Sequence, residues 1–292
     1  QPILTNEDMQ KIRKISEIGD NQFVSRVLDT TFDKNTGYTG FEKCLENICI
    51  KSENVVKEGG NIIVLSDRQF GKDRIALPAL LAIASVHHHL IRKGLRTAVG
   101  LVVESAEPRE VHHFAVLAGY GAEAINPYMA FDTILDLKQK NMLSKDVSET
   151  EAVSRYIKSV NKGLLKVMSK MGISTYQSYC GAQIFDAVGL SEEFVSKYFK
   201  GTSTQISGVG INEIAKETIT RHEEAYSNLE VLRDSLDVGG DYAVRKRGEV
   251  HAWSSDEITN LQHAVRSNSF DTFKEYSRSM DEQEERLFTI RG

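Results

Sequence analysis

The stretch NIIVLSDRQFGKDRIALPALLAIASVHHHLIRKGLRTAVGLVV, residues 61–103, decides the fold of this chain. It opens with Asn61 to Leu65, whose continuous apolar run is typical of a strand buried on both faces. Leu77 to Lys93 follows as a nearly all-apolar helix that Gly94 ends, and Thr97 to Val103 is a second buried strand. A strand, a helix and a strand in this order predict parallel pairing through a right-handed crossover.

The same alternation continues on both sides of this unit. Apolar residues recur at helical spacing from Tyr38 to Glu58, where Gly59 and Gly60 stop the pattern. Beyond residue 103 we expect strands at Ala124 to Asn126, Ile173 to Tyr179 and Ser203 to Ile206, and helices at Glu110 to Ala118, Val153 to Met171, Ala182 to Val188, Glu192 to Phe199 and Ile211 to Tyr226. The sequence therefore predicts an α/β fold of mainly parallel β/α units.

The character of the sequence changes after Ser227. Residues 229–253 mix a glycine pair with a basic cluster, and two helices are expected at Asp256 to Arg266 and Phe270 to Ser279. We therefore divide the chain into an α/β domain, residues 1–228, and an extended and helical tail, residues 229–292.

Composition and charge argue against several classes of protein. Apolar residues make up 40% and charged residues 26% of the chain, close to the averages of soluble globular proteins. The 36 basic and 41 acidic residues leave a net charge of −5 with no basic footprint for nucleic acid. No apolar run approaches the roughly 20 residues that cross a bilayer, and the N-terminus lacks the order of a signal peptide. We expect a cytoplasmic protein without a nucleic-acid or membrane partner.

Histidines and cysteines do not converge in the sequence. The adjacent histidines His87 to His89 point in three directions on a helix, so they cannot share one metal ion. Cys44 and Cys49 are separated by about 140° around a helix, and we expect them to be core residues. Cys180 follows a predicted strand and precedes a predicted helix, whose N-terminus could lower a thiol pKa, but no catalytic partner lies beside it in the sequence.

Polar residues follow the predicted strands where parallel sheets place their ligand sites, at the carboxyl edge. The candidates are Ser66, Asp67 and Arg68, then Glu104 and Ser105, then Asn126, and then Gln177 and Ser178. The alternative is that these residues only begin solvated loops or contact another domain, as polar residues do after strands in any such fold.

Several blocks of sequence resemble the large subunit of glutamate synthase. They include QPILTNE at residues 1–7, HHHLIR at 87–92, GLVVES at 100–105 and VHHF at 111–114. Longer and more specific likenesses are GYGA at 119–122 leading to NPY at 126–128, NKGLLKVMSKMGISTYQSYCGAQIF at 161–185, and GEVHAW at 248–253. The blocks occur in the family's order and cover nearly the whole chain.

The resemblance implies an enzyme that hydrolyses L-glutamine at an N-terminal cysteine and passes the ammonia through an internal tunnel. The ammonia is then condensed reductively with 2-oxoglutarate to give glutamate. Reduced FMN supplies the hydride, and a 3Fe–4S cluster feeds it from NADPH or ferredoxin. Within that layout the chain is similar to most of the central domain, between the glutaminase and FMN domains, whose fold is similar to the TIM barrel of FMN-linked oxidoreductases.

The departures from the family pattern limit what can be transferred. Position 1 is Gln1 instead of the nucleophilic cysteine, and the three cysteines lack the spacing of the cluster. We therefore assign no catalytic, cofactor-binding or metal-binding residue, and we expect a fragment cut from a longer protein. Its expected role is a structural connector that braces the ammonia tunnel, partners the other domains of the parent chain and is inactive alone. The alternatives are a stand-alone β/α enzyme or small-molecule-binding module, which a bound flavin would reveal, and an interaction scaffold.

Overall fold

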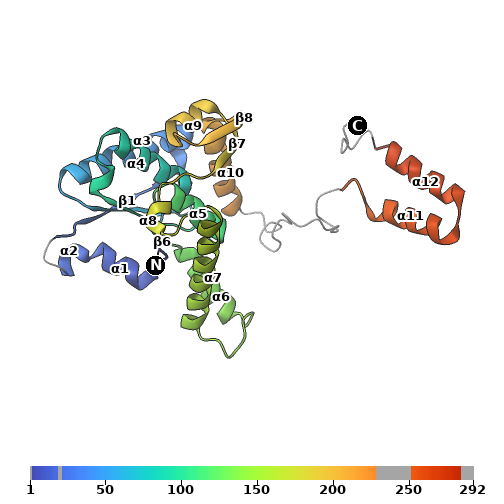
Figure 1. The fold of residues 1–292 in the computed structure, drawn as a ribbon, viewed down its shortest axis with the longest axis horizontal. Coiled ribbons are helices and arrows are strands. Elements are labelled where there is room, and N and C mark those ends of the chain that lie inside the picture. The colour runs from blue at the N-terminus through green and yellow to red at the C-terminus, as the bar shows by residue number, and fades with distance from the viewer. Residues whose placement is uncertain (1, 19–21, 228–250, 284–292) are drawn as a thin grey trace. The chain divides into compact units, whose positions relative to one another are not determined.

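Residues 2–18, 22–227 and 251–283 are described by a computed structural model of the chain (Figure 1). The chain divides into two units, Gln1–Ser227 and Asn228–Gly292, which are described separately below. Most of the extended segment expected after Ser227, residues 229–250, lies outside the described residues.

The first unit is built on a parallel sheet of four strands. Their order is β1 (Ser25–Asp29), β3 (Ile62–Ser66), β5 (Gly100–Glu104) and β6 (Ala124–Asn126). The N-terminal segment continues the sheet beyond β6, because Leu4 N donates to Ile125 O at 2.9 Å and Ile125 N donates to Pro2 O at 2.7 Å. The parallel α/β architecture predicted from residues 61–103 is confirmed.

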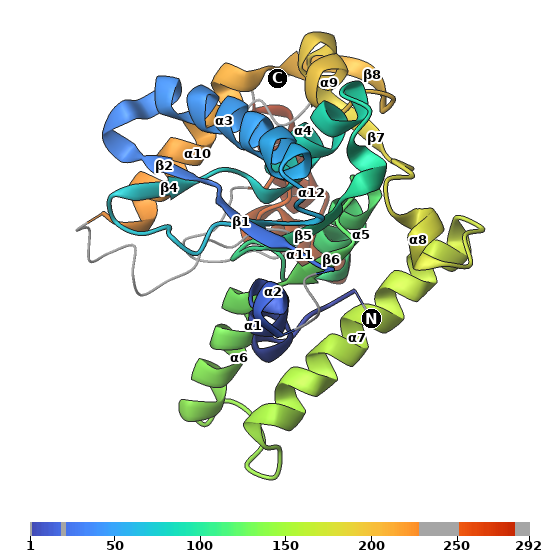
Figure 2. The same cartoon turned by 90° about the vertical axis from the view of Figure 1, so that its left-hand side faces the viewer.

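One face of this sheet carries the main core. Odd-numbered residues of the central strands, such as Ile63 and Leu101, share one hydrophobic cluster with the helices that cover them. These helices are α3 (Gly37–Lys57), α4 (Ala79–Arg92) and α5 (Val111–Gly119), and Figure 2 shows them layered over the strands. The apolar body of α4, almost all of it buried, matches the expectation of a helix pressed against a sheet.

The opposite face of the sheet is covered by α1 (Asn6–Arg13), which a short helix, α2 (Ile15–Ile18), follows. Met9 is fully buried there and packs with Val64 and Val102 in a second cluster. The helix begins with a capping box in which Thr5 Oγ1 accepts from Asp8 N at 3.1 Å and Asp8 bonds back to Thr5.

Smaller elements complete the body. β2 (Thr31–Asp33) and β4 (Arg74–Ala76) form an antiparallel pair, and the helices α6 (Tyr128–Gln139) and α7 (Glu149–Lys170) lie side by side (Figure 2). Two short 3₁₀ turns lie at Lys34–Thr36 and Arg96–Ala98. The C-terminal third holds α8 (Tyr176–Tyr179), β7 (Asp186–Leu190), α9 (Glu192–Tyr198), β8 (Ser203–Val209) and α10 (Ile211–Ala225), with β7 and β8 paired in parallel.

Two expectations about the first unit are wrong, and a barrel is not confirmed. Residues 173–179 do not form a strand: Thr175 caps α8, and Ile173 N bonds back to Met168 O to close the end of α7. Residues 182–188 do not form a helix, because β7 occupies Asp186–Leu190. No closed barrel forms among the described residues, since the four-stranded sheet stays open and β7 and β8 pair only with each other.

Within residues 251–283, the described part of the second unit, two helices are joined by a tight turn, α11 (Ser255–Ser267) and α12 (Phe270–Asp281). Asn268 adopts the left-handed conformation at the turn, φ 53°, and its amide bonds back to Val265. Both helices expected in this region are confirmed.

Candidate functional site

The last residues of the four parallel strands form one polar row across the sheet. Asp29 pairs with Ser66, Ser66 with Glu104, and Glu104 with Asn126 in the strand register. Alternation of side chains along the strands points this row to the face that α1 covers. Three of the candidates taken from the sequence, Ser66, Glu104 and Asn126, are thus brought together.

Glu104 is the centre of the row and is fully buried, with 0% of its side chain exposed. Its carboxylate accepts from Ser66 Oγ at 2.6 Å and from Arg68 Nε at 2.7 Å, and it also pairs with Arg13 of α1. A buried carboxylate is stable only when charged partners and hydrogen bonds replace water. Two guanidiniums and a hydroxyl do this here, so Glu104 joins β5 to β3 and to α1.

Asn126 ties the same edge to the start of α1. Its Nδ2 donates to Leu4 O and to Asn6 Oδ1, both at 3.0 Å, and Arg68 Nη2 also donates to Asn6 Oδ1, at 3.4 Å. The N-terminal segment therefore closes the carboxyl edge of the sheet instead of leaving it open to a ligand.

Asp67 and Ser105 form a second buried group, one residue beyond the ends of β3 and β5. Asp67 accepts from Ser105 Oγ and from Tyr128 OH, both at 2.6 Å, and from Ala106 N at 3.0 Å. Burial raises the pKa of Asp67 above its ordinary value, while the hydrogen bonds from Ser105 and Tyr128 act in the opposite direction. Arg68 stacks over the Tyr128 ring at 4.1 Å, which links this group to the Glu104 row.

Glu107 is a member of this region that the sequence reasoning missed. Its Oε2 accepts from Ala79 N at 2.7 Å, so it caps the N-terminus of α4, where Pro78 offers no side-chain cap. Burial raises the pKa of Glu107. A carboxylate is favourable beside a helix N-terminus, but Glu107 lies 28 residues after Ala79, so no local sequence pattern links the two.

The carboxyl edge is thus a closed network in which each buried carboxylate has named partners. A groove of about 690 Å³ lies beside it, lined in part by Phe131 of α6 and by Val153 and Ile157 of α7. Asn6 belongs both to the groove and to the network.

Comparison with known proteins decides the family. Residues 1–191 match the glutamate synthase central domain. The chain belongs to this family. It is 42% identical to the glutamate synthase [NADPH] large chain of Bacillus subtilis over 282 residues, which cover 97% of this chain and 18% of that protein. It is 40% identical to the glutamate synthase [NADH] of Schizosaccharomyces pombe, over 100% of this chain and 14% of that protein.

A plant relative extends the comparison to another class of electron donor. The chain is 38% identical to ferredoxin-dependent glutamate synthase 2 of Arabidopsis thaliana, over 96% of this chain and 17% of that protein. The central-domain chain therefore spans less than a fifth of the length of these relatives.

Two candidate residues lie elsewhere in this central domain. Gln177 and Ser178 are exposed on the four-residue helix α8, which replaces the strand predicted there. Ser178 N donates to Thr175 Oγ1 at 3.3 Å, an ordinary cap of that helix. These two residues therefore do not belong to the strand-end network.

The cysteines of the domain are protonated at neutral pH. Burial raises the pKa of Cys44 to about 11, that of Cys49 to about 12 and that of Cys180 to about 11. Cys180 follows the C-terminal end of α8 instead of preceding a helix, so the expected influence of a helix N-terminus is wrong. A neutral thiol is a poor nucleophile and a poor metal ligand.

The histidine cluster has a structural explanation. Burial lowers the pKa of His87 to about 3 and that of His88 to about 4, and His87 Nδ1 accepts from Arg96 Nε at 2.9 Å. Gly121, with φ +105°, passes so close that a Cβ there would lie 2.3 Å from His87 Nδ1. The neutral imidazole therefore fills a packed site in which a neighbouring side chain has no room.

Within residues 2–18, 22–227 and 251–283, no three His, Cys, Asp or Glu side chains form a group that could hold a metal ion. None of the helices in these described parts has both the length and the apolar character that crossing a bilayer requires.

Proposed function

We propose that this chain is the central-domain portion of a glutamate synthase that forms two molecules of glutamate from L-glutamine, 2-oxoglutarate and two electrons. The family match over residues 1–191 and the relatives that align over nearly the whole chain support this proposal. In it, residues 1–228 are the C-terminal part of the central domain, and residues 229–292 lead toward the FMN domain. The partners are the glutaminase and FMN domains, and the compartment is the cytoplasm.

The closed carboxyl edge is the observation that carries a structural role. Parallel α/β enzymes place substrates at this edge. Here Arg13, Asn6 and Leu4 hold the N-terminal segment against Glu104 and Asn126 instead. A domain that uses its ligand edge for internal bonds is suited to hold two neighbouring active sites in a fixed relation. In this proposal it braces the route along which ammonia travels between them.

The parent's cofactors have no site of their own in this proposal. FMN and the 3Fe–4S cluster belong to other parts of the synthase, where the flavin supplies the hydride. The described residues do not fit either group, because the polar strand-end side chains bond to one another and no three His, Cys, Asp or Glu side chains in this part of the chain form a group that could hold a metal ion. The likeness to an FMN-type barrel remains part of the proposal, with the further strands contributed by the longer chain.

The purified 292-residue chain tests the assignment directly. We expect a colourless protein that neither hydrolyses glutamine nor forms glutamate, with a full-length synthase as the positive control. Flavin absorbance at about 450 nm would favour the alternative, a self-sufficient β/α enzyme or binding module. Turnover of both substrates by the chain alone would contradict the connector role.

Glu104→Ala in the full-length synthase tests the bracing role. The substitution leaves Arg13 and Arg68 without their buried partner and should lower the free energy of unfolding of the domain by about 3–5 kcal/mol. We expect glutamine hydrolysis to exceed 2-oxoglutarate consumption, with ammonia appearing in the medium. Asp136→Ala, which removes an exposed ion pair between Asp136 of α6 and the C-cap residue Lys140, is the matched control and should leave these two rates equal. Equal rates in a demonstrably destabilised Glu104→Ala enzyme would contradict bracing.

A further inference from the structure

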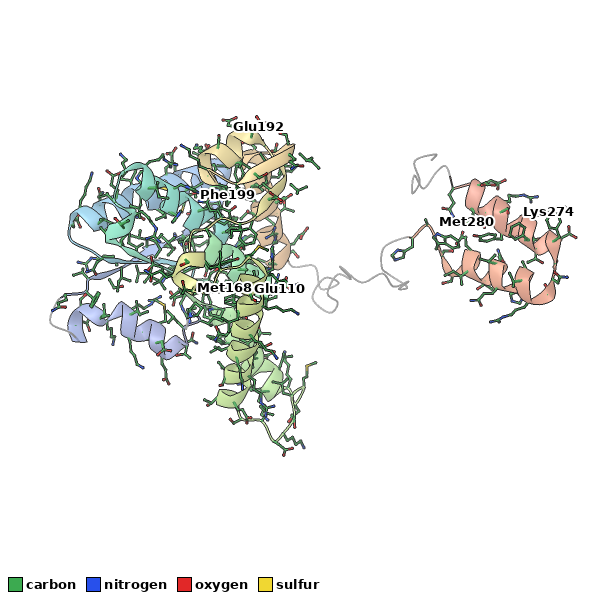
Figure 3. The ribbon with its side chains drawn as sticks, viewed as in Figure 1. Glu110, Met168, Glu192, Phe199, Lys274 and Met280 are labelled. Atoms are coloured by element: carbon green, nitrogen blue, oxygen red, sulfur yellow. The ribbon has the colours of Figure 1, made fainter. Side chains whose placement is uncertain are left out.

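The β7–β8 ribbon, residues 186–190 and 203–209, has two unlike faces. Ala187 and Leu190 pack against the main core, as does Phe199, which follows α9. Figure 3 shows Phe199 among the side chains of the body and Glu192, at the start of α9, at its periphery. The inner face of the ribbon is therefore covered by the chain's own helices.

The outer face carries an uncovered apolar pair. Val188 is 71% exposed and Ile206 is 61% exposed, and the two are direct partners in the strand register. Single exposed apolar residues are common on protein surfaces. Two β-branched side chains placed side by side on neighbouring strands are instead the arrangement that packs against another layer.

The parallel pairing of β7 and β8 makes the exposure of Val188 and Ile206 more significant. Parallel strands occur almost always with both faces covered, and two strands alone are too few for independent stability. The exposed residues of β8 other than Ile206 are Ser203, Gln205, Ser207 and Gly208, none of which carries a charge. On β7, Asp186 is also exposed and places one carboxylate at the beginning of the strand. The centre of the outer face, Val188 and Ile206, is uncharged and fits an apolar partner.

The irregular register of β8 indicates which surface of the ribbon is suited to a contact. The register shifts twice along the pair, so two residues of β8 lie opposite one of β7, and then three opposite two. Gly189 adopts φ +74° at the second shift, where a Cβ on Gly208 would lie 2.2 Å from Gly189 O. Such bulges make a strand edge irregular and hinder addition of a further strand. The outer face of the ribbon is therefore a better docking surface than its edge.

We propose that an apolar, uncharged segment of the parent synthase, from outside residues 1–292, lies across the outer face of the β7–β8 ribbon and covers Val188 and Ile206. This rests on the proposed function, since it requires the longer chain. That chain is available in the relatives, of which these residues make up only 14–18% in the examples above. The ribbon is thus a contact by which the central domain is held within the synthase.

Cysteine labelling tests the contact. Val188→Cys and Ile206→Cys are each introduced into the 292-residue chain and into the full-length synthase and treated with a maleimide. We expect rapid labelling in the chain and labelling at least tenfold slower in the synthase. Thr204→Cys, on the same strand but facing inward, is the matched control and should react slowly in both proteins.

The outcomes separate the possible occupants. Equal, rapid labelling in both proteins overturns the proposal. Slow labelling in the 292-residue chain at every concentration also overturns it, because the chain would then cover the face itself. Slow labelling that is relieved by dilution identifies a second copy as the occupant and overturns it as well. None of these results bears on the balance between glutamine hydrolysis and 2-oxoglutarate consumption, so the docking face and the connector role can fail separately.

A charge on the outer face gives a second readout. Val188→Asp should leave the thermal midpoint of the 292-residue chain unchanged, since the side chain is exposed there, and shorten the thermal-inactivation half-life of the synthase several-fold. Val188→Thr, which keeps the branched shape without the charge, should have a small effect in both. An equal loss of stability in both proteins after Val188→Asp would assign the residue to the chain's own packing and contradict docking.

Discussion

At the scale of single residues, the charge of each buried polar side chain matches that of its partners and so stabilises the fold. Glu104 faces two guanidiniums, whereas His87 faces one guanidinium and remains a neutral acceptor. The difference follows from charge, because a neighbouring cation stabilises an ionised carboxylate and destabilises a protonated imidazole. Glu104 thereby joins elements that are distant in sequence, whereas His87 and Arg96 are nine residues apart.

His87 predicts an acid-sensitive fold. Its pKa is lowered from 6.5 to about 3, mainly by burial and then by Arg96. The unfolded chain therefore binds a proton between about pH 6.5 and 3 that the folded chain rejects, so stability is lost as the pH falls through this window. Between pH 7 and pH 5 the loss from this residue should be about 2 kcal/mol.

Urea unfolding of His87→Gln at the two pH values checks this prediction. The variant keeps a hydrogen-bond acceptor for Arg96, and its loss of stability between pH 7 and pH 5 should be about 2 kcal/mol smaller than that of the wild type. His263→Gln, exposed on α11, is the control and should show the full wild-type loss. The same pH dependence in His87→Gln and wild type would show that this imidazole does not drive it.

At the scale of elements, α1 has a larger role than its eight residues suggest. It covers the second face of the sheet through Met9, and it supplies Arg13 and Asn6 to the strand-end network. Without it, Val64 and Val102 would meet water, and Glu104 would lose one of its two cations.

Met9→Ala measures this contribution. Loss of a fully buried methionine side chain should lower the free energy of unfolding by about 2–5 kcal/mol, because the transfer of the side chain out of water and its packing are both lost. Met142→Ala is the control, since Met142 is 69% exposed, and it should change stability by less than about 0.5 kcal/mol. Denaturant unfolding followed by circular dichroism gives both values, and a small effect at Met9 would show that the sheet face does not depend on α1.

The predictable elements are those with a strong local pattern. The run Ile62 to Leu65 and the long apolar helix before Gly94 have one plausible structure each. Six of the eight strand-end candidates lie at the ends of β3, β5 and β6, which the sequence predicts. Residues 173–179 alternate without a clear apolar face, and the capping hydroxyl of Thr175 favours a helical turn. The roles of Arg13 and Asn6 depend on contacts across about a hundred residues, which no local pattern encodes.

At the scale of the whole molecule, the two units differ in how much they bury. The first has an extended core on one face of its sheet and a smaller cluster on the other. In the described part of the second unit, α12 has no buried residue, and α11 buries only Glu257 and Ala264. Most of the chain's stability should therefore come from residues 1–227.

Truncation after Ser227 tests this distribution. The shortened chain should retain the thermal midpoint of the full 292 residues, because residues 251–283, the described part of the second unit, bury little apolar area. Thermal unfolding followed by circular dichroism compares the two, with Met9→Ala in the truncated chain as a control that the remaining transition reports on the core. A clearly lower midpoint after truncation would mean that the second unit stabilises the first.

The N-terminal segment also has a consequence for biosynthesis. Leu4 accepts its hydrogen bond from Asn126, which is 122 residues later in the chain. A ribosome that adds about 5–20 residues per second needs about 6–25 seconds to make the intervening chain. Throughout that interval residues 2–4 have no strand to join and α1 has no finished sheet to cover. Residues 2–4 are thus made well before the strand that they join, and a chaperone that shields Met9 during this time would favour correct folding.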